Sequence, residues 1–159
     1  MELYLGSNVE VKEPAVLSIR KTADFGMGFY TTSSLGQAQD WAIIKAGRRG
    51  KGVATVSTYN FDYQNAKDNI KIKEFPEATE EWLDFVVENR TGVYEGEKYD
   101  LVIGPVADDK TITVIDEYIG GAYPKKMAIE LLEPQNLTDQ YAFLTKTALH
   151  YLNYTGVEK

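Results

Sequence analysis

Apolar and polar positions along this chain predict short strands interspersed with helices. Runs rich in β-branched and aromatic residues predict strands at residues 3–5, 29–32, 53–59, 101–103 and 140–144, and more weakly at 70–72. Because strands and helices mix without strict alternation, we expect an α+β fold rather than a doubly wound sheet. Neither a repeat nor a linker-like tract interrupts the chain, so residues 1–159 are expected to form one domain.

Helical spacing of apolar residues marks the remaining segments. It predicts helices at 35–48, 77–90, 111–119, 124–133 and 146–154. Ser34 and Gln37 form a capping-box pair before the first of these, and Gly50 is expected to end it. The segment 111–119 also has a strand-like β-branched run, but the acidic pair Asp108-Asp109 before it and the glycines after it favour a helix.

The net charge and the residue types present limit which binding partners and which catalytic or metal sites the chain can have. The chain has 17 basic and 24 acidic residues, a net charge of −7, which opposes tight non-specific binding to nucleic acid or an anionic membrane. Cysteine is absent, so disulfides, thiol nucleophiles and cysteine-zinc sites are excluded. His150 is the single histidine, and its place in a predicted terminal helix favours a structural role. No metal site is expected.

The N-terminus has no charged segment followed by an apolar core, and no apolar run approaches the length of a membrane span. These features predict a soluble cytoplasmic protein.

Two glycine-containing segments could bring backbone close to a ligand. Gly6-Ser7 directly follows the first predicted strand, and residues 24–30 (DFGMGFY) lead an aromatic pair onto the second. Each alone also fits an ordinary turn. The Gly-x-Gly in the second segment is not a dinucleotide fingerprint, because the third glycine is missing and a strand follows.

Charged clusters have simpler explanations. Four basic residues, Lys45, Arg48, Arg49 and Lys51, lie at the end of the first predicted helix. The helix dipole accounts for them without a partner, although they could also serve as a local nucleic-acid contact. The pair Asp108-Asp109 suits helix capping better than a divalent cation, which needs more oxygen ligands.

Taken together, six ordered blocks resemble a bacterial family of ADP-ribosyltransferase-like proteins labelled a domain of unknown function. The family pattern reads LYHGS, DFGxGFYxT, QAxxWA, EEWLDFV, YDxVxGPVAxD and DQYxF. The corresponding segments here begin at Leu3, Asp24, Gln37, Glu80, Tyr99 and Asp139. The resemblance covers nearly the whole chain.

This resemblance implies two packed, bent sheets with NAD held in the split between them, as in diphtheria-type toxins and poly(ADP-ribose) polymerases with a His-Tyr-Glu triad. It implies that the Gly6 backbone holds the nicotinamide carboxamide, with Ser7 beside it, and that Tyr30 stacks on the ring. Phe25 joins the NAD contacts, and Arg20 would contact the pyrophosphate. Gln140 matches the third triad position, where it would orient the ribose but offer little charge stabilisation.

The sequence departs from the family at Leu5, where the pattern has the triad histidine. Losing that hydrogen bond to the adenosine ribose would cost about 1–3 kcal/mol, or roughly 5- to 150-fold in affinity. The resemblance therefore implies an NAD-dependent ADP-ribosyltransferase or NAD glycohydrolase, whose activity Leu5 would attenuate. It would be a toxin or effector with a small antitoxin protein as partner. The alternative is a catalytically inert NAD- or nucleotide-binding module that acts through protein contacts.

Overall fold

The computed structural model describes residues 1–16, 23–107, 111–133 and 137–158. Strands and helices are mixed along these residues, which confirms the α+β class. The strands are β1 (Glu2–Ser7), β2 (Phe29–Thr31), β3 (Thr55–Phe61), β4 (Ile72–Glu74), β5 (Leu101–Pro105), β6 (Asp139–Phe143) and β7 (Leu152–Val157). The helices are α1 (Leu35–Arg49), α2 (Tyr63–Asn69), α3 (Glu80–Arg90), α4 (Ile112–Ile119), α5 (Lys125–Leu132) and α6 (Lys146–Leu149).

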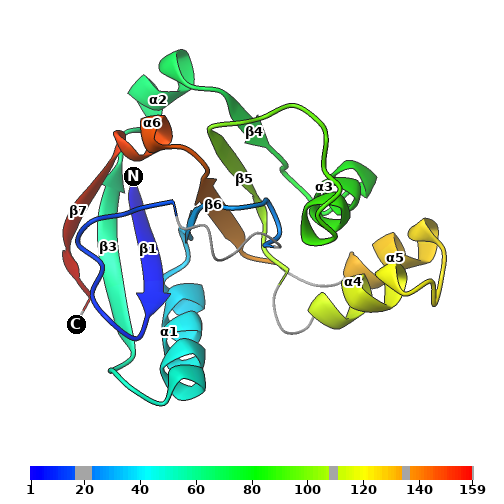
Figure 1. Cartoon of the computed structure of the whole chain (residues 1–159), viewed down its shortest axis with the longest axis horizontal. Coiled ribbons are helices and arrows are strands. Elements are labelled where there is room, and N and C mark those ends of the chain that lie inside the picture. Colours follow the sequence, from blue (N-terminus) through cyan, green and yellow to red (C-terminus); the bar gives the residue numbers. More distant parts are fainter. Residues whose placement is uncertain (17–22, 108–110, 134–136, 159) are drawn as a thin grey trace.

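The strands form two sheets that meet at one point. One sheet has the order β1-β3-β7 and is antiparallel, and the other has the order β2-β6-β5-β4, in which β4 runs parallel to β5. An isolated bridge joins Tyr4 of β1 to Thr32, just after β2. Figure 1 shows the three-stranded sheet beside α1, the four-stranded sheet in the middle of the molecule and α3–α5 beyond it.

Residues that alternate along the strands pack into two cores on opposite faces of the four-stranded sheet. The first, which we call the inner core, lies between the two sheets. Its strand residues are Leu3, Phe29, Tyr59, Phe61, Leu101, Ile103, Phe143 and Leu152. This face is closed by aromatic edge contacts, such as that between Phe61 and Phe143 at 5.2 Å between ring centroids.

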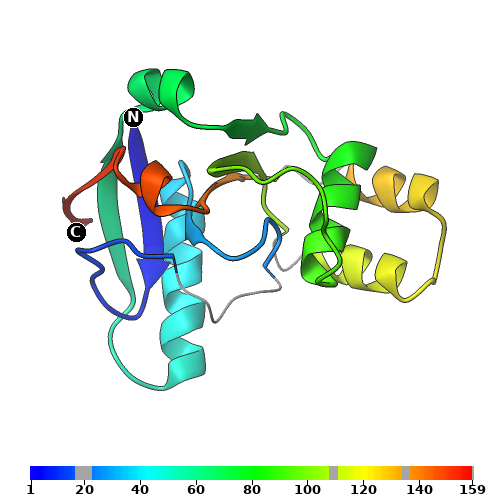
Figure 2. The ribbon, with the colours of Figure 1, turned by 45° about the horizontal axis from the view of Figure 1, so that its top comes forward.

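The opposite face, which we call the outer face, carries the second core. There Tyr30, Val102 and Ala142 pack under α3, α4 and α5, together with Phe25 from the loop before β2. Figure 2 shows these three helices grouped on one side of the sheet. On the outer face of the three-stranded sheet, α1 covers β1 and β3. The junction of the two sheets therefore lies between α1 and the loop that carries Phe25.

Several predicted elements are confirmed with small shifts in their ends. In α1 the Ser34 hydroxyl accepts the Gln37 amide, and Gly50 ends the helix at a φ of 64°. Segment 112–119 is a helix, as the flanking residues favoured. Strand β5 is fully buried at the centre of its sheet.

Two expectations were wrong, and one helix was not predicted. The helix predicted for 146–154 ends at Leu149, and β7 follows, because Leu152–Val157 completes the three-stranded sheet against β3. Helix α2 was not predicted, since Ala66 is its only buried residue and it has no apolar stripe. Gly6-Ser7 belongs to β1 and pairs with β3 rather than forming a turn.

Candidate functional site at the junction of the two sheets

The Tyr4–Thr32 bridge sets the geometry of the junction. The Tyr4 amide donates to the Thr32 carbonyl at 2.8 Å, and the Thr32 amide donates to the Tyr4 carbonyl at 2.9 Å. Because strand backbone groups alternate in direction, the amide and carbonyl of Gly6 also face β2. Extending the bridge's register would set Gly6 opposite Tyr30, but the bridge is isolated and no ladder joins these two among the described residues. The Gly6 amide and carbonyl thus point toward β2, at a position in β1 that is itself buried.

At Gly6, α1 also approaches β1 closely. A Cβ atom at this position would lie 1.9 Å from the Ala38 carbonyl oxygen and 2.7 Å from the Ala42 nitrogen. Both are backbone atoms, so no side chain can move to make room. The glycine is therefore required by packing, independently of any ligand.

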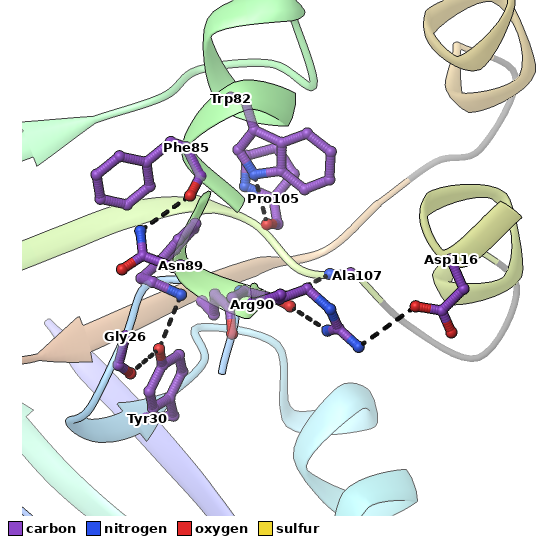
Figure 3. A network of polar contacts seen from close by, with 12 residues as sticks. Gly26, Tyr30, Trp82, Phe85, Asn89, Arg90, Pro105, Ala107 and Asp116 are labelled. Atoms are coloured by element: carbon purple, nitrogen blue, oxygen red, sulfur yellow. Dashed lines mark hydrogen bonds and ion pairs between the residues drawn. The ribbon is translucent and has the colours of Figure 1, made fainter. Parts of the chain in front are cut away.

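Tyr30 lies on the outer face and closes the turn that precedes its strand. Its hydroxyl accepts the Phe25 amide at 2.9 Å. It also donates to the Gly26 carbonyl at 2.5 Å, as Figure 3 shows. Gly26 has a φ of 94°, which suits glycine in this turn. The rings of Tyr30 and Phe25 are stacked with centroids 6.4 Å apart. Only 9% of Tyr30 is exposed, so a ligand would meet the ring at its edge unless neighbouring side chains move.

Gln140 lies on the same face as Tyr30, because its neighbour two residues on, Ala142, is the cross-strand partner of Tyr30. Its side chain is 3% exposed, and its Nε2 donates to Asp24 Oδ2 at 3.0 Å. The Asp24 carboxylate also accepts Arg90 Nη1 at 2.6 Å and the Ala107 amide at 3.1 Å. In Figure 3, Arg90 reaches from the end of α3 toward Ala107 and Asp116.

The sequence reasoning named Asp24 only as part of a motif and missed Arg90. The ion pair between them links residues 66 positions apart. Arg90 fits the basic residue expected in the last turn of a helix, which gave no reason to assign it another role. The signal that the sequence offers is an aspartate next to an aromatic and glycine-rich segment, because a carboxylate buried in such a segment needs several donors.

The other predicted NAD contacts are divided between the faces. Gly6, Tyr30, Phe25 and Gln140 lie around the outer side of the junction. Leu5 instead packs against the inner core, so its side chain does not join Tyr30 and Gln140. Ser7, the next residue after Gly6, is buried, and its hydroxyl lies 3.4 Å from Asn8 Oδ1.

Arg20 and the acidic pair Asp108-Asp109 lie outside the described residues. The basic cluster is at the C-terminal end of α1, where Arg48, Arg49 and Lys51 are exposed. In Figure 1 this end of α1 points away from α3–α5.

Contacts between α1 and β6 hold the junction together. The Thr138 hydroxyl donates to Gln37 Oε1 at 2.8 Å, and the Asp139 carboxylate accepts the Ser33 amide at 2.9 Å. The Thr32 hydroxyl donates to the Asp139 carbonyl at 2.8 Å. These bonds fix the start of α1 beside the strand that carries Gln140.

Two recesses in the surface of the described residues are lined by neither Tyr30 nor Gln140. One of about 210 Å³ is lined by residues next to Gln140 along β6 and by the end of β5, but not by Gln140 or Tyr30 themselves. A second of about 220 Å³ lies along α3 near Phe85. No group of three His, Asp or Glu side chains that could hold a metal occurs in the described residues. None of the helices described is long and apolar enough to cross a membrane.

Tyrosines near the inner core have altered acidity. Burial, reinforced by the Asp139 charge, raises the pKa of Tyr141 to about 12. Burial also raises the pKa of Tyr59 well above its usual range. Both hydroxyls therefore stay protonated at neutral pH and act as neutral parts of the core.

Comparison with known proteins places the chain in a family. A search of curated proteins finds no match. The family described as "Protein of unknown function (DUF3990)" matches residues 1–154, nearly the full length. The chain therefore belongs to the DUF3990 family.

Proposed function

We propose that this protein is an ADP-ribosyltransferase-type enzyme that binds NAD at the junction of its two sheets. It would cleave the bond between nicotinamide and ribose and pass ADP-ribose to a macromolecule or to water. NAD is the substrate, and no metal takes part in the proposed reaction. A toxin role with a small neutralising protein remains a proposal that follows from the resemblance.

The backbone of Gly6 on the β2 side of β1 carries this proposal. A carboxamide has one carbonyl acceptor and an NH₂ donor, and the Gly6 amide and carbonyl that face β2 would complement both once a ligand reaches this buried position. Extending the register of the Tyr4–Thr32 bridge would set Tyr30, the aromatic residue expected to contact the nicotinamide ring, opposite Gly6. A ring held at this position would then lie beside a tyrosine and near the strand that carries Gln140.

The side chains present suit a slow reaction. Breaking the nicotinamide bond develops positive charge on the ribose, which a nearby carboxylate would stabilise best. Gln140 is neutral and can contribute only hydrogen bonds and orientation, while the nearby Asp24 charge is paired with Arg90. We therefore expect modest turnover.

Release of free nicotinamide from NAD by the purified protein tests the proposal. Two variants target the site: Gln140→Met keeps the side-chain length but removes the amide, and Tyr30→Phe removes the hydroxyl that closes the 25–30 turn. Each should lower kcat/KM at least tenfold. Tyr63→Phe is the matched control, because it removes a hydroxyl bonded to the exposed Glu74 far from the junction. Its turnover should equal that of the natural chain.

Leu5→His restores the residue found in the family pattern. If the histidine reaches the adenosine ribose, apparent NAD affinity should rise roughly 5- to 150-fold. Nicotinamide release by neither the natural chain nor Leu5→His would contradict the enzyme proposal.

A second candidate is a binding module that holds NAD without cleaving it. It is favoured by Leu5, which offers no hydrogen-bonding group, and by the internal bonding of Tyr30 and the Gln140 amide. Calorimetry distinguishes the two: this alternative predicts heat of NAD binding with no nicotinamide released at any protein concentration.

A further inference from the structure

The feature that the proposed function leaves unused is the buried carboxylate of Asp24. It is 7% exposed and is surrounded by three donors: the Arg90 guanidinium, the Ala107 amide and Gln140 Nε2. Since all three neighbours donate, both carboxylate oxygens act as acceptors.

We propose that Asp24 is a positioning residue that determines which end of the Gln140 amide faces the substrate. A glutamine side chain can turn over to exchange its oxygen and its nitrogen, and its surroundings decide which arrangement holds. A carboxylate that only accepts must face Nε2. The Oε1 atom then points away from Asp24 as an acceptor, ready for the hydroxyl donors of a ribose. The ribose part of this inference rests on the proposed function, whereas the orientation of the amide does not.

The same contact explains why residue 140 is glutamine. A carboxylate here would lie within hydrogen-bond distance of the Asp24 carboxylate, and two such groups repel unless they share a proton. In this chain the negative charge belongs to Asp24, and position 140 must be a neutral donor.

Asp24 also connects the two proposed site residues. Asp24 lies in the turn that is closed by a hydrogen bond from the Gly26 amide to the Ala23 carbonyl. The Tyr30 hydroxyl forms two hydrogen bonds to the backbone of the same turn. Arg90 fixes this turn to α3 and extends toward Asp116, whose Oδ1 lies 3.9 Å from Nη2. Displacing Asp24 would therefore disturb Gln140 directly and Tyr30 through the backbone.

Asp24→Asn tests the inference with little change in shape. Arg90 requires an acceptor, so the asparagine oxygen should face it and the asparagine NH₂ should face Gln140. Gln140 must then turn over to present Oε1 to that NH₂. We expect the Gln140 side-chain NH₂ resonances to shift in spectra of ¹⁵N-labelled protein and to exchange with solvent at least tenfold faster. The value of kcat/KM for NAD should fall about tenfold.

Asp116→Asn is the matched control, because it removes a carboxylate near the same arginine without touching Gln140. Neither the Gln140 resonances nor turnover should change. Unchanged Gln140 resonances in Asp24→Asn, or equal shifts in both variants, would overturn the inference.

A charge exchange gives a second test. The single change Gln140→Glu should lower Tm by about 5 °C at pH 7, because two carboxylates then face each other. Adding Asp24→Asn should recover at least half of this loss, although the Ala107 amide then loses its acceptor. If the Tm losses of Gln140→Glu and Asp24→Asn simply add in the double variant, Asp24 does not determine which residue position 140 can hold.

The two proposals fail in different ways. Absence of nicotinamide release with a normal response of Gln140 to Asp24→Asn would reject the enzyme proposal and keep the positioning contact. Release of nicotinamide with no response of Gln140 would reject the positioning role alone.

Discussion

The two faces of the four-stranded sheet bury different kinds of side chain. The inner core is aromatic and neutral, with edge-to-face contacts such as Phe29 on Tyr59 at 5.7 Å and 87°. The outer face has an aromatic core of its own, but it also buries the Asp24 carboxylate with its arginine and glutamine. Apolar packing stabilises without demanding fixed polar partners, whereas a buried charge constrains the orientation of each donor around it. The inner face thus supplies stability, and the outer face holds candidate chemistry in place.

The largest expected effect is on the inner face. Phe143→Ala removes a fully buried ring between the sheets and should lower the free energy of unfolding by about 4 kcal/mol. Denaturant unfolding monitored by fluorescence measures this. NAD binding per folded molecule should be unchanged, and a specific loss of binding would show that the two faces are not independent.

Gly6→Ala should cost about 3 kcal/mol, because its Cβ would collide with the Ala38 carbonyl and neither backbone can yield freely. It should also abolish NAD binding. Gly47→Ala lies on α1 in open space and serves as the control, where about 0.5–1 kcal/mol of stabilisation is expected. Unfolding of both variants in urea gives the comparison, and equal stability of the two would contradict the close approach of α1 to β1.

Arg90→Met removes the charged partner of Asp24 and should lower stability by about 2 kcal/mol. This is less than for a fully buried pair, because the Arg90 side chain is 24% exposed. Lys125→Met, which breaks an exposed pair with Asp84, should cost much less stability than Arg90→Met, because solvent screens an exposed pair. Thermal unfolding at low and high salt measures both, and only the Lys125 effect should shrink with salt. Similar losses in the two variants would contradict a special role for the buried pair.

The smallest effect at neutral pH comes from Tyr141, because it develops only at alkaline pH. An unfolded tyrosine titrates near pH 10, whereas Tyr141 in the fold has a pKa of about 12. Below pH 10 both states keep the proton; above it the unfolded chain loses its proton first, so stability falls by up to about 1.4 kcal/mol per pH unit until pH 12. Tyr141→Phe should make this decline shallower. An identical slope in the variant, from urea unfolding at pH 9 to 11.5, would show that this hydroxyl is not buried as described.

The sequence predicted those features of the fold that depend on residues close together in the chain, such as helix ends and the apolar face of a helix. The Ser34 cap and Gly50 defined α1, and the apolar face of α3 was evident from its spacing. Strand β7 could not be predicted, because it is a strand only through pairing with β3, about 95 residues earlier in the chain. Short α2 has no amphipathic pattern to detect.

The candidate site was predictable as a set of residue types but not as an arrangement. The glycine-serine and aromatic motifs indicated Gly6 and Tyr30 through resemblance. Their opposition depends on the Tyr4–Thr32 bridge, and the contact of Asp24 with Gln140 spans 116 positions. The resemblance likewise did not predict the direction of the Leu5 side chain. Strand alternation turns it toward the inner core, away from the face of Tyr30 and Gln140.

Titration of ¹⁵N-labelled protein with NAD tests the central claim most directly. If the outer side of the junction is the NAD site, the Gly6 backbone amide and the Gln140 side-chain NH₂ should shift in parallel and saturate. The backbone amide resonances of Tyr59 and Phe143, whose side chains lie on the inner face, should not shift. Absence of any shift at Gly6 at millimolar NAD, or shifts confined to the inner face, would contradict the account.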